Sequence, residues 1–429
     1  MRPVVIVGGG ISGLSTAYFL SQAGIPLILV EREPKLGGLI QTEHIDGFIV
    51  EGGPDSFLTS KPWARELIHG VGLAGDIIGS NDHRRATYIW KGSRLIQMPE
   101  GLSMMVPARI SPILTTPLLS FPAKLRAFRE LFRRPVKEGP PDRSIADFVI
   151  EHYGQEMLDY VAEPLLAGIF GGDPKELSAA SVLPKFVEWE SKYGSLSRAA
   201  RHEIKPTGEP AFTSLRHGMG SLIEALQQQT RATIVRGTVD RIEQGWRVRV
   251  NGEWIDTSHL VLACRDTESV LPSLFPSVPY SSSTVVALAY RREDVPHAMQ
   301  GFGFLVPKRE RKSVAACTWV QQKFEHRVPP DKVLLRCFVT GDVGGVPQEL
   351  NEKMGIRAEP LFRRVFDWPH SMPQYTVGHA HRVETIEGML KDLPGLHLVT
   401  NALYGIGIPD CVRLARRVAE KIRAGASGA

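Results

Sequence analysis

The stretch VVIVGGGISG, residues Val4 to Gly13, decides the fold of this chain. Its first four residues are apolar and β-branched, which predicts a short buried strand. Apolar residues then recur at helical spacing up to Gly24, and a second apolar strand, Leu27 to Val30, is followed by Glu31. The glycines at positions 8, 10 and 13 thus form a Gly-x-Gly-x-x-Gly motif between a strand and a helix, with an acidic residue about 20 residues on. This combination predicts a dinucleotide-binding site.

Each part of the motif has a physical task in binding a dinucleotide. Gly8 permits the tight turn, Gly10 lets backbone N–H groups approach a pyrophosphate, and Gly13 lets the helix pack closely on the strand. The helix N-terminus brings its partial positive charge to the phosphates. Glu31 can accept hydrogen bonds from an adenosine ribose. The alternative is a glycine-rich turn of another α/β protein, which the helix and the acidic residue make the weaker interpretation.

Composition limits the class of protein. The chain has 429 residues, 43% of them hydrophobic, which suffices for substantial cores and two or three domains. Its net charge of +5 suits an anionic membrane surface or an acidic substrate and does not indicate a nucleic-acid partner. No Cys-x-x-Cys pair occurs, so we expect reduced, mostly buried thiols rather than a zinc site or disulfides. The cysteines are Cys264, Cys317, Cys337 and Cys411.

The sequence gives no sign of export or of a membrane span. The apolar start of the chain does not read as a signal peptide, because it contains the glycine motif and no small-residue cleavage site follows. No run approaches the roughly 18 apolar residues of a transmembrane helix. We therefore expect a cytoplasmic protein, free or peripherally attached to the inner face of the membrane.

Two more glycine loops indicate which dinucleotide is bound. Gly37-Gly38 follows the first motif closely, and Gly52 to Ser56 follows a predicted strand, Phe48 to Glu51. An NAD dehydrogenase has no need of these loops, whereas flavoproteins of the large glutathione-reductase-like class carry both. The run from Val4 to Gly38 resembles their FAD-binding signature. Leu39 stands where that signature usually has arginine.

Residues 100 to 137 differ in character from the rest of the chain. Prolines interrupt an apolar, methionine-containing stretch, and basic residues follow it. Such a segment fits a membrane interface, where cations meet anionic lipid head groups. It fits equally a helical subdomain packed on its own core, whose basic residues form a solvated face. The basic residues are Lys124, Arg126, Arg129, Arg133, Arg134 and Lys137.

The remaining patterns predict helices and strands that alternate along the chain. Ser144 should cap a helix that reaches Tyr153, and a helix should follow from Gln155 towards Leu166. Alternation between 283 and 338 predicts a mixed or antiparallel sheet, followed by a helix around Gln348 to Val365. Strands are expected at Thr233–Val239, Trp246–Val250, Leu260–Cys264, Val285–Tyr290, Gly303–Val306, Val314–Val320 and Val333–Phe338.

Two features near the C-terminus bear on chemistry. His379 and His381 would share one face of a strand, where two satisfied histidines are favoured over a metal site. Gly405 to Asp410 precedes a final helix, roughly Cys411 to Arg423. Glycine-rich backbone ahead of a helix offers N–H groups and a positive helix end to a flavin ring or its phosphates.

Four segments in order carry a resemblance to a known family. They are Glu51 to Phe57, Gly168 to Ser178, His217 to Leu226 and Gly405 to Cys411. Together they closely resemble the oxygen-dependent porphyrinogen oxidases of haem synthesis, the protoporphyrinogen and coproporphyrinogen oxidases. The match spans nearly the whole chain, and GIFGGDP in the second segment is its most specific part. The chain departs from the family at Thr400, where glycine is usual, and its middle is shorter than in many members.

The resemblance implies an α/β architecture of three parts. A discontinuous, glutathione-reductase-like FAD-binding Rossmann domain would comprise residues 1–75, 210–275 and 385–429. A mixed-sheet substrate-binding domain would comprise residues 76–99 and 276–384. Residues 100–209 would form an inserted helical domain that associates with the membrane, which favours the membrane interpretation of residues 100 to 137.

The reaction implied is the oxidation of a porphyrinogen to the porphyrin. FAD would be reduced and then reoxidised by O2, giving H2O2, and the six electrons lost per macrocycle require three flavin cycles. The sequence leaves open whether protoporphyrinogen IX or coproporphyrinogen III is the substrate, and whether the protein is a monomer or a homodimer. The alternatives are a flavin amine oxidase of the same superfamily and a flavin-binding protein without turnover.

The resemblance also assigns residues to the site. Arg85 would bind a substrate propionate, with a surface arginine as the alternative, and Gly168 and Phe170 would line the pocket, with Phe170 in the core as the alternative. No catalytic side chain and no metal ligand is expected, because the hydride goes to FAD. FAD would contact Gly8, Gly9, Gly10, Ile11, Ser12, Gly13, Glu31, Arg32, Gly38, Leu39, Gly53, Pro54, Asp55, Ser56, Val239, Ile406, Gly407 and Ile408.

Overall fold

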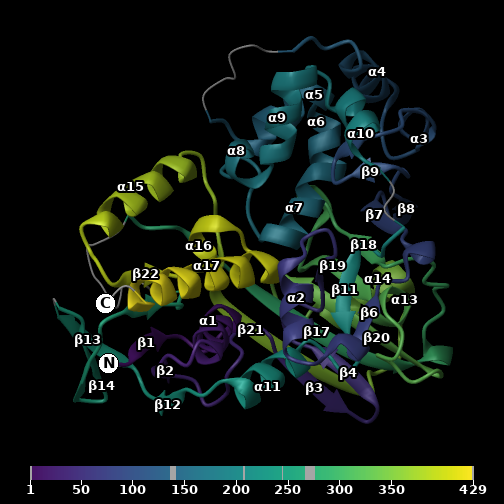
Figure 1. Ribbon diagram of the computed structural model, residues 1–429. Coiled ribbons are helices and arrows are strands. Elements are labelled where there is room, and N and C mark those ends of the chain that lie inside the picture. Colours follow the sequence, from purple (N-terminus) through teal and green to yellow (C-terminus); the bar gives the residue numbers. More distant parts are fainter. Residues whose placement is uncertain (1, 136–141, 206–207, 244, 266–275, 428–429) are drawn as a thin grey trace. The chain divides into compact units, whose positions relative to one another are not determined.

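A computed structural model describes residues 2–135, 142–205, 208–243, 245–265 and 276–427 (Figure 1). The chain divides into two compact units, and each is discontinuous in sequence. The first unit comprises Met1–Ser80, Pro210–Val278 and His381–Ala429. The second comprises Asn81–Glu209 and Pro279–Ala380. The predicted assignment of cofactor, substrate and membrane roles to parts of the chain stays a prediction.

The first unit is built on a five-stranded parallel sheet. The strand order is β12 (Thr233–Arg236), β2 (Leu27–Glu31), β1 (Val4–Val7), β16 (Leu260–Leu262) and β22 (Leu396–Leu398). All four residues of β1 are buried, as expected for an apolar run with neighbours on both sides. Helix α1 (Ile11–Gln22) follows β1 directly and packs against α17 (Ile408–Ser427), the yellow helix beside it in Figure 1. The predicted strand–helix–strand unit is confirmed.

Smaller elements complete the first unit. They are the hairpin β3 (Thr42–Ile45) and β4 (Phe48–Glu51), the sheet of β5 (Phe57–Leu58), β11 (Phe212–Leu215) and β6 (Ile77–Gly79), the meander β13 (Val239–Glu243), β14 (Arg247–Val250) and β15 (Glu253–Asp256), and the helices α2 (Trp63–Gly70), η1 (Ala74–Asp76), α11 (Gly220–Gln229) and α16 (Asn401–Tyr404). Helix α15 (His379–Lys391) begins in the second unit and ends in the first.

The second unit contains a seven-stranded mixed sheet. Its order is β21 (Phe362–Pro373), β17 (Tyr280–Arg291), β20 (Lys332–Val339), β19 (Val314–Trp319), β18 (Gly303–Leu305), β7 (Thr87–Lys91) and β8 (Arg94–Gln97). Neighbouring strands are antiparallel except β18 and β7, which are parallel. The mixed sheet predicted from alternation is therefore confirmed. Short elements beside it are η2 (Asp82–Arg84), η4 (Arg292–Asp294), η5 (Lys308–Glu310), α13 (Val320–Lys323) and α14 (Val346–Met354).

Helices of the second unit pack on an apolar core of their own. They are α3 (Ser111–Thr115), α4 (Phe121–Glu130), α5 (Ile145–Tyr153), α6 (Gln155–Met157), the π-helix η3 (Leu158–Ala162), α7 (Glu163–Phe170), α8 (Ala179–Val182), α9 (Pro184–Tyr193) and α10 (Leu196–Glu203), with the short hairpin β9 (Leu102–Ser103) and β10 (Val106–Pro107). The predicted cap is confirmed, because the Asp147 N–H donates to Ser144 Oγ at 3.0 Å. Among the described residues, no helix is long and apolar enough to cross a membrane.

Three predictions of secondary structure were wrong. The expected strand Thr233–Val239 is two strands, because the chain turns at Gly237, whose N–H donates to the Glu31 carbonyl oxygen at 3.0 Å. The expected helix from Gln348 to Val365 ends at Gly355, which has φ +72°, and β21 follows. His379 and His381 start helix α15, where residues two apart point to different sides, so they do not share a strand face.

Candidate functional site

The three glycine loops of the first unit lie against one another. The Gly37 N–H donates to the Gly9 carbonyl oxygen at 2.8 Å, and Gly10 and Gly37 form a parallel bridge. A Cβ on Gly38 would lie 3.2 Å from the Gly10 Cα, and a Cβ on Gly53 would lie 1.8 Å from the carbonyl oxygen of Leu39. Backbone contact of this kind leaves no room for side chains. Predicted cofactor residues from three separate stretches are thus brought together.

The first loop has the geometry that a diphosphate requires. Gly10 precedes α1 and supplies no side-chain cap, and the first turn of α1 carries no acidic residue. The N–H groups of that turn have no partner within the helix, and they point along its positive end. Ile11 and Ser12 stand in this turn, with Ser12 buried. These observations fit a bound dinucleotide phosphate, the group that the sequence predicts here.

Glu31 lies at the same loop. Its Oε2 accepts the Gly9 N–H at 2.6 Å, and its Oε1 accepts the Glu33 N–H at 2.8 Å. The carboxylate is therefore fixed beside the glycine motif while retaining acceptor positions for a ribose. Arg32 is exposed and pairs with Glu33 at 3.5 Å. Val239 opens β13, two residues after the Gly237 N–H contact with Glu31.

The Gly53 to Ser56 loop is tied to β11. Ser214 Oγ donates to the Asp55 carbonyl oxygen at 2.6 Å, and Ser56 Oγ donates to Asp55 Oδ1 at 2.7 Å. Pro54, Asp55 and Ser56 are all partly exposed. The loop is thus fixed by hydrogen bonds while part of its surface stays accessible.

The C-terminal loop opens helix α17. Ile406 and Gly407 are partly exposed, and Ile408 is the buried first residue of the helix. Just before it, Thr400 Oγ1 accepts the Ala402 N–H at 3.2 Å and caps α16. The departure at Thr400 therefore serves as a helix cap in this chain.

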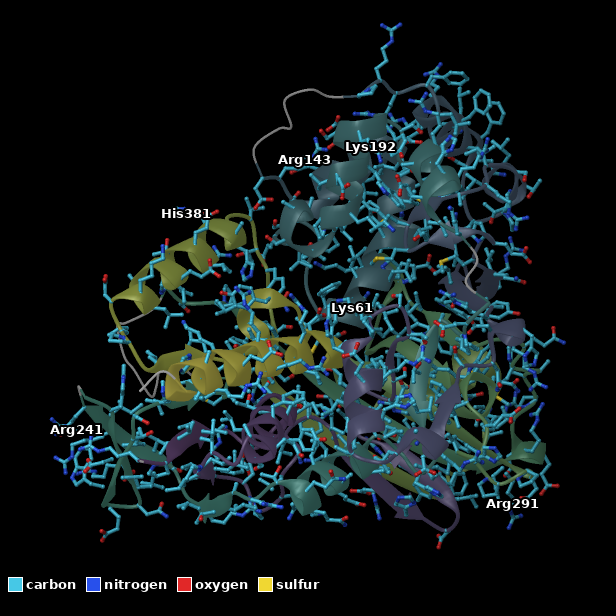
Figure 2. All side chains as sticks on the ribbon, in the orientation of Figure 1. Lys61, Arg143, Lys192, Arg241, Arg291 and His381 are labelled. Carbon is cyan, nitrogen blue, oxygen red and sulfur yellow. The ribbon has the colours of Figure 1, made fainter. Side chains whose placement is uncertain are left out.

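Sequence reasoning missed one ion pair at this loop. Lys61 Nζ lies 2.5 Å from Asp410 Oδ2 and joins two stretches that are 349 residues apart. Figure 2 labels Lys61, beside the start of α17. No spacing rule links a lysine to such a distant aspartate, so only the folded chain reveals the pair.

The predicted substrate residues belong to the second unit. Arg85 is exposed, and its N–H donates to the Asp82 carbonyl oxygen at 3.1 Å just before β7. Gly168 and Phe170 stand together at the end of α7, partly exposed. Phe170 packs partly against the helical core, and its carbonyl oxygen accepts Gln374 Nε2 at 2.9 Å. Their role towards the substrate stays a prediction.

The segment from Gly168 to Ser178 has a constrained backbone. Gly171 has φ +59° and ends α7, and a Cβ on Gly172 would lie 2.0 Å from Gln374 Oε1. The Ser178 N–H donates to the Tyr375 carbonyl oxygen at 2.8 Å. The glycines therefore let this segment lie directly on the chain around 374–377.

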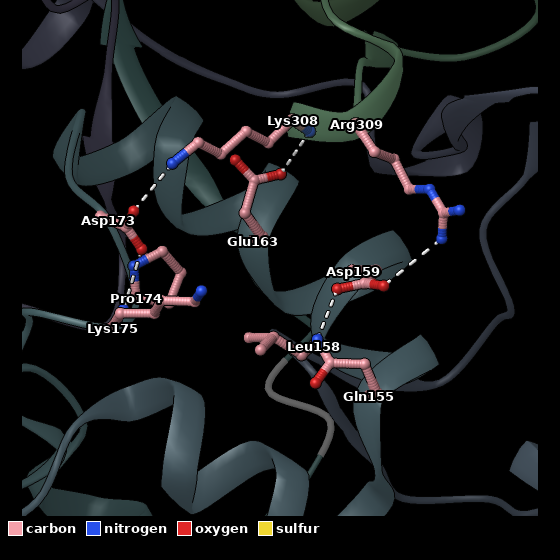
Figure 3. A pocket seen from close by; sticks show the side chains of 9 residues that line it. All are labelled: Gln155, Leu158, Asp159, Glu163, Asp173, Pro174, Lys175, Lys308 and Arg309. Atoms are coloured by element: carbon pink, nitrogen blue, oxygen red, sulfur yellow. Dashed lines mark hydrogen bonds and ion pairs between the residues drawn. The ribbon is translucent and has the colours of Figure 1, made fainter.

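A hollow of about 530 Å³ adjoins this segment (Figure 3). Opposite charges pair across it: Lys308 Nζ lies 2.8 Å from Asp173 Oδ2, and Arg309 lies 3.5 Å from Asp159. Burial raises the pKa of Asp173, but hydrogen bonds from Lys308 and the Lys175 N–H outweigh it and lower that pKa overall. The residues that line the hollow are Gln155, Leu158, Asp159, Glu163, Asp173, Pro174, Lys175, Lys308 and Arg309. None of the predicted substrate residues lines it, and within the described residues no cluster suited to a metal ion occurs.

Comparison with known proteins gives a consistent result over the full length. The family model for flavin containing amine oxidoreductases matches residues 11–423. The chain is 32% identical to coproporphyrinogen III oxidase of Bacillus subtilis, covering 96% of each protein. It is 31% identical to coproporphyrinogen III oxidase of Staphylococcus aureus, covering 98% of this chain and 99% of the relative.

A solved structure has the same fold throughout. It bears the provisional name protoporphyrinogen oxidase and comes from Exiguobacterium sp. 255-15. It superposes with a TM-score of 0.88 at 30% identity and covers 99% of both chains. The similarity therefore includes both compact units of the chain.

Proposed function

The chain belongs to the family of flavin containing amine oxidoreductases, and we propose that it oxidises coproporphyrinogen III to coproporphyrin III in haem biosynthesis. The observation that carries the proposal is the full-length similarity, above 30% identity, to two curated relatives of that name. The provisional protoporphyrinogen name of the Exiguobacterium structure favours the other porphyrinogen at a similar identity. We give more weight to the names of the two curated relatives than to the provisional name of the Exiguobacterium structure.

The protein is an FAD-dependent oxidoreductase, and the three glycine loops would bind the cofactor. The N–H groups at the start of α1 would neutralise the pyrophosphate, and Glu31 would accept the ribose hydroxyls. The loops Gly37 to Leu39, Gly53 to Ser56 and Gly405 to Ile408 would enclose the isoalloxazine ring. FAD bound by these residues would supply the hydride acceptor and the route by which electrons reach O2, with H2O2 as the product. These residues orient the cofactor, and no side chain of the protein needs to act as general base.

A binding site for the substrate requires cations for its propionates and apolar residues beside its macrocycle. Coproporphyrinogen III has four propionates, and Arg85 presents an exposed guanidinium that can bind a carboxylate through two hydrogen bonds. Gly168 and Phe170 would line the pocket at the end of α7. Three rounds of two-electron transfer complete the six-electron oxidation.

The deciding experiment supplies each candidate substrate to the purified protein without oxygen. We expect coproporphyrinogen III to bleach the bound flavin, and admitted air to restore its colour with release of H2O2 and appearance of the porphyrin band. Faster bleaching by protoporphyrinogen IX would reassign the substrate. Bleaching by an amine alone would indicate an amine oxidase, and bound FAD that none of them reduces would indicate a protein without turnover.

We also infer that α4 carries a peripheral membrane contact. Four large apolar residues recur at helical spacing: Phe121, Leu125 and Phe128 on α4, and Phe132 in the turn just after it. Phe121 and Phe132 are 77% and 70% exposed. The opposite face of α4 is buried in the helical core through Ala123 and Ala127. α4 is therefore compatible with both interpretations of residues 100 to 137. Its buried face packs on the helical core, and its exposed apolar face is available for contact with lipid.

Basic side chains accompany this apolar face. Arg126 and Arg129 are exposed on α4, and Lys124 is partly exposed. Cations flanking an apolar helix face favour an anionic lipid surface, such as the inner face of a cytoplasmic membrane. Lys137, also predicted to contribute, lies outside the described residues. The expected monomer or homodimer stays a prediction, which light scattering tests.

A further inference from the structure

The ion pair between Lys61 and Asp410 joins two predicted flavin loops. Lys61 follows the Gly53 to Ser56 loop by five residues, just beyond strand β5. Asp410 stands in the first turn of α17, which begins where the Gly405 to Ile408 loop ends. Their charged atoms lie 2.5 Å apart, and the Asp410 side chain is only 8% exposed while that of Lys61 is 39% exposed. The carboxylate is thus mostly withdrawn from water at the point of contact.

The carboxylate of Asp410 also shapes its own loop. Gly405 has φ +120°, and a Cβ there would lie 2.6 Å from Asp410 Cγ. The Asp410 N–H donates to the Gly407 carbonyl oxygen at 2.9 Å. The side chain therefore packs directly against Gly405 and Gly407, so the position of the carboxylate bears on the conformation of this loop.

Two cations approach the carboxylate from different directions. Arg413, on α17 itself, lies 3.8 Å from Asp410 Oδ1 and donates to the Tyr404 carbonyl oxygen at 3.2 Å. Lys61 approaches Oδ2 from the side of the Gly53 to Ser56 loop. Loss of Lys61 would leave the local pair with Arg413 but remove the tie between the two loops.

The next residue extends this connection to the first glycine loop. Cys411 is buried and its thiol is hydrogen-bonded to Ser12, in the first turn of α1. Burial raises the pKa of Cys411 to about 11, so the thiol stays protonated and neutral at pH 7. The first turn of α1, in the first glycine loop, therefore also contacts the start of α17.

We propose that Lys61 is a positioning residue for the flavin, acting through its ion pair with Asp410 to keep the Gly53 to Ser56 and Gly405 to Ile408 loops at a fixed separation. The inference rests on the proposed FAD site. Removing the cation beside a largely buried carboxylate leaves its charge less well compensated, with the longer contact to Arg413 at 3.8 Å remaining. Without Lys61, the Asp410 carboxylate would turn towards water and the flavin would lose one wall of its site.

The test compares three variants of the full chain. Lys61→Met removes the charge at similar length, and Lys61→Arg retains it. Arg416→Met is the matched control, because Arg416 pairs with Glu66 at 2.5 Å and so joins α17 to α2 away from the loops. Titration of each apoprotein with FAD gives the Kd from the change in flavin fluorescence. The visible spectrum and midpoint potential of the bound flavin are measured in parallel.

The expected result separates positioning from general stability. Lys61→Met should raise the Kd for FAD about tenfold, which corresponds to about 1.4 kcal/mol, and should alter the flavin spectrum and potential. Lys61→Arg should restore most of the affinity, and Arg416→Met should leave all three readouts unchanged. Unaltered FAD affinity and spectrum in Lys61→Met would overturn the inference.

A second variant, Asp410→Asn, keeps the inference testable if Lys61→Met does not fold. If circular dichroism shows Lys61→Met unfolded, Asp410→Asn carries the same expectations and the same overturning result. A wild-type apoprotein that takes up no FAD would instead refute the proposed function, independently of Lys61. Wild-type binding together with normal binding by the variant would refute the positioning role alone.

Discussion

The carbonyl oxygen of Gly8 occupies the space that a side chain at Gly13 would need: a Cβ on Gly13 would lie 1.8 Å from that oxygen. Gly13→Ala should therefore push α1 away from β1, destabilise the first unit by about 1–3 kcal/mol and abolish FAD retention. Urea unfolding and the flavin absorbance of the purified protein measure both effects. Gly75→Ala is the control, because no atom lies within 4 Å of a Cβ there. A yellow, stable Gly13→Ala protein would contradict the close packing.

Glu31 should contribute to cofactor affinity through its charge. Glu31→Gln weakens an acceptor that receives the Gly9 N–H and, by our proposal, the ribose hydroxyls, so the Kd for FAD should rise about tenfold. Equilibrium titration of the apoprotein measures it. Glu33→Gln, which alters the neighbouring surface pair with Arg32, should have no effect. Equal Kd values for the two variants would remove Glu31 from the site.

Arg85 should affect substrate binding more than turnover. If its guanidinium binds a propionate, Arg85→Ala should raise KM for coproporphyrinogen III about tenfold with little change in kcat. Steady-state oxygen uptake measures both constants. Arg84→Ala is the control, because the Arg84 guanidinium donates to Gln322 Oε1 at 3.1 Å. Unchanged kinetics in Arg85→Ala would make Arg85 a surface residue.

The exposed apolar side chains of α4 and of the turn after it should determine vesicle binding. The double variant Phe121→Ser/Phe132→Ser should lower partitioning onto anionic vesicles about tenfold, because both rings are largely exposed. Its free energy of unfolding should change by no more than about 0.5 kcal/mol, as for other exposed sites. Co-sedimentation with vesicles is the measurement. Val365→Ser, on exposed β21, is the control. Equal sedimentation of all three proteins would count against membrane contact.

A buried acid–histidine cluster should make the helical part sensitive to acid. His152 lies between Glu130 at 3.3 Å and Glu190 at 3.0 Å, and Glu130 also accepts the Leu196 N–H. Burial raises the pKa of both carboxyl groups, but hydrogen bonds from His152 and other donors outweigh it and lower both pKa values overall. Their contribution is therefore present above the ordinary carboxyl pKa and is lost as the pH falls through the lowered values.

Urea unfolding between pH 7 and pH 3 tests this cluster. The wild type should lose stability steeply below about pH 4.5, where carboxyl groups of the unfolded chain protonate. Glu130→Gln should be less stable at pH 7 by about 3 kcal/mol, because His152 and the Leu196 N–H lose a buried, charged acceptor. Its stability should also depend less on pH. A variant with the wild-type pH profile would show that Glu130 does not carry the acid response.

Local patterns predicted those parts of the fold that depend on neighbours in sequence. The run from Val4 to Glu31 specifies its own strand, turn and helix, and the structure confirms each. Predictions failed where secondary structure depends on pairing between residues that are far apart in sequence. β21, with the mixed sequence FRRVFDWPHSMP, is a strand because it pairs with β17. The strand predicted over Thr233–Val239 is interrupted at Gly237, because the Glu31 carbonyl oxygen of β2 accepts the Gly237 N–H. The pairing of Lys61 with Asp410 lies beyond any local pattern for the same reason.

The order of strands in the parallel sheet determines when this sheet can form during synthesis of the chain. β1 is made first, yet its neighbour β16 begins at Leu260 and the edge strand β22 at Leu396. The nascent chain must therefore wait for most of its length to leave the ribosome before the sheet closes, while the helical core of the second unit is already complete. By our proposal, a chain released before Gly405 is added would lack one of the flavin-binding loops and should be colourless. If the proposed site is right, FAD can be acquired only once the polypeptide is nearly complete.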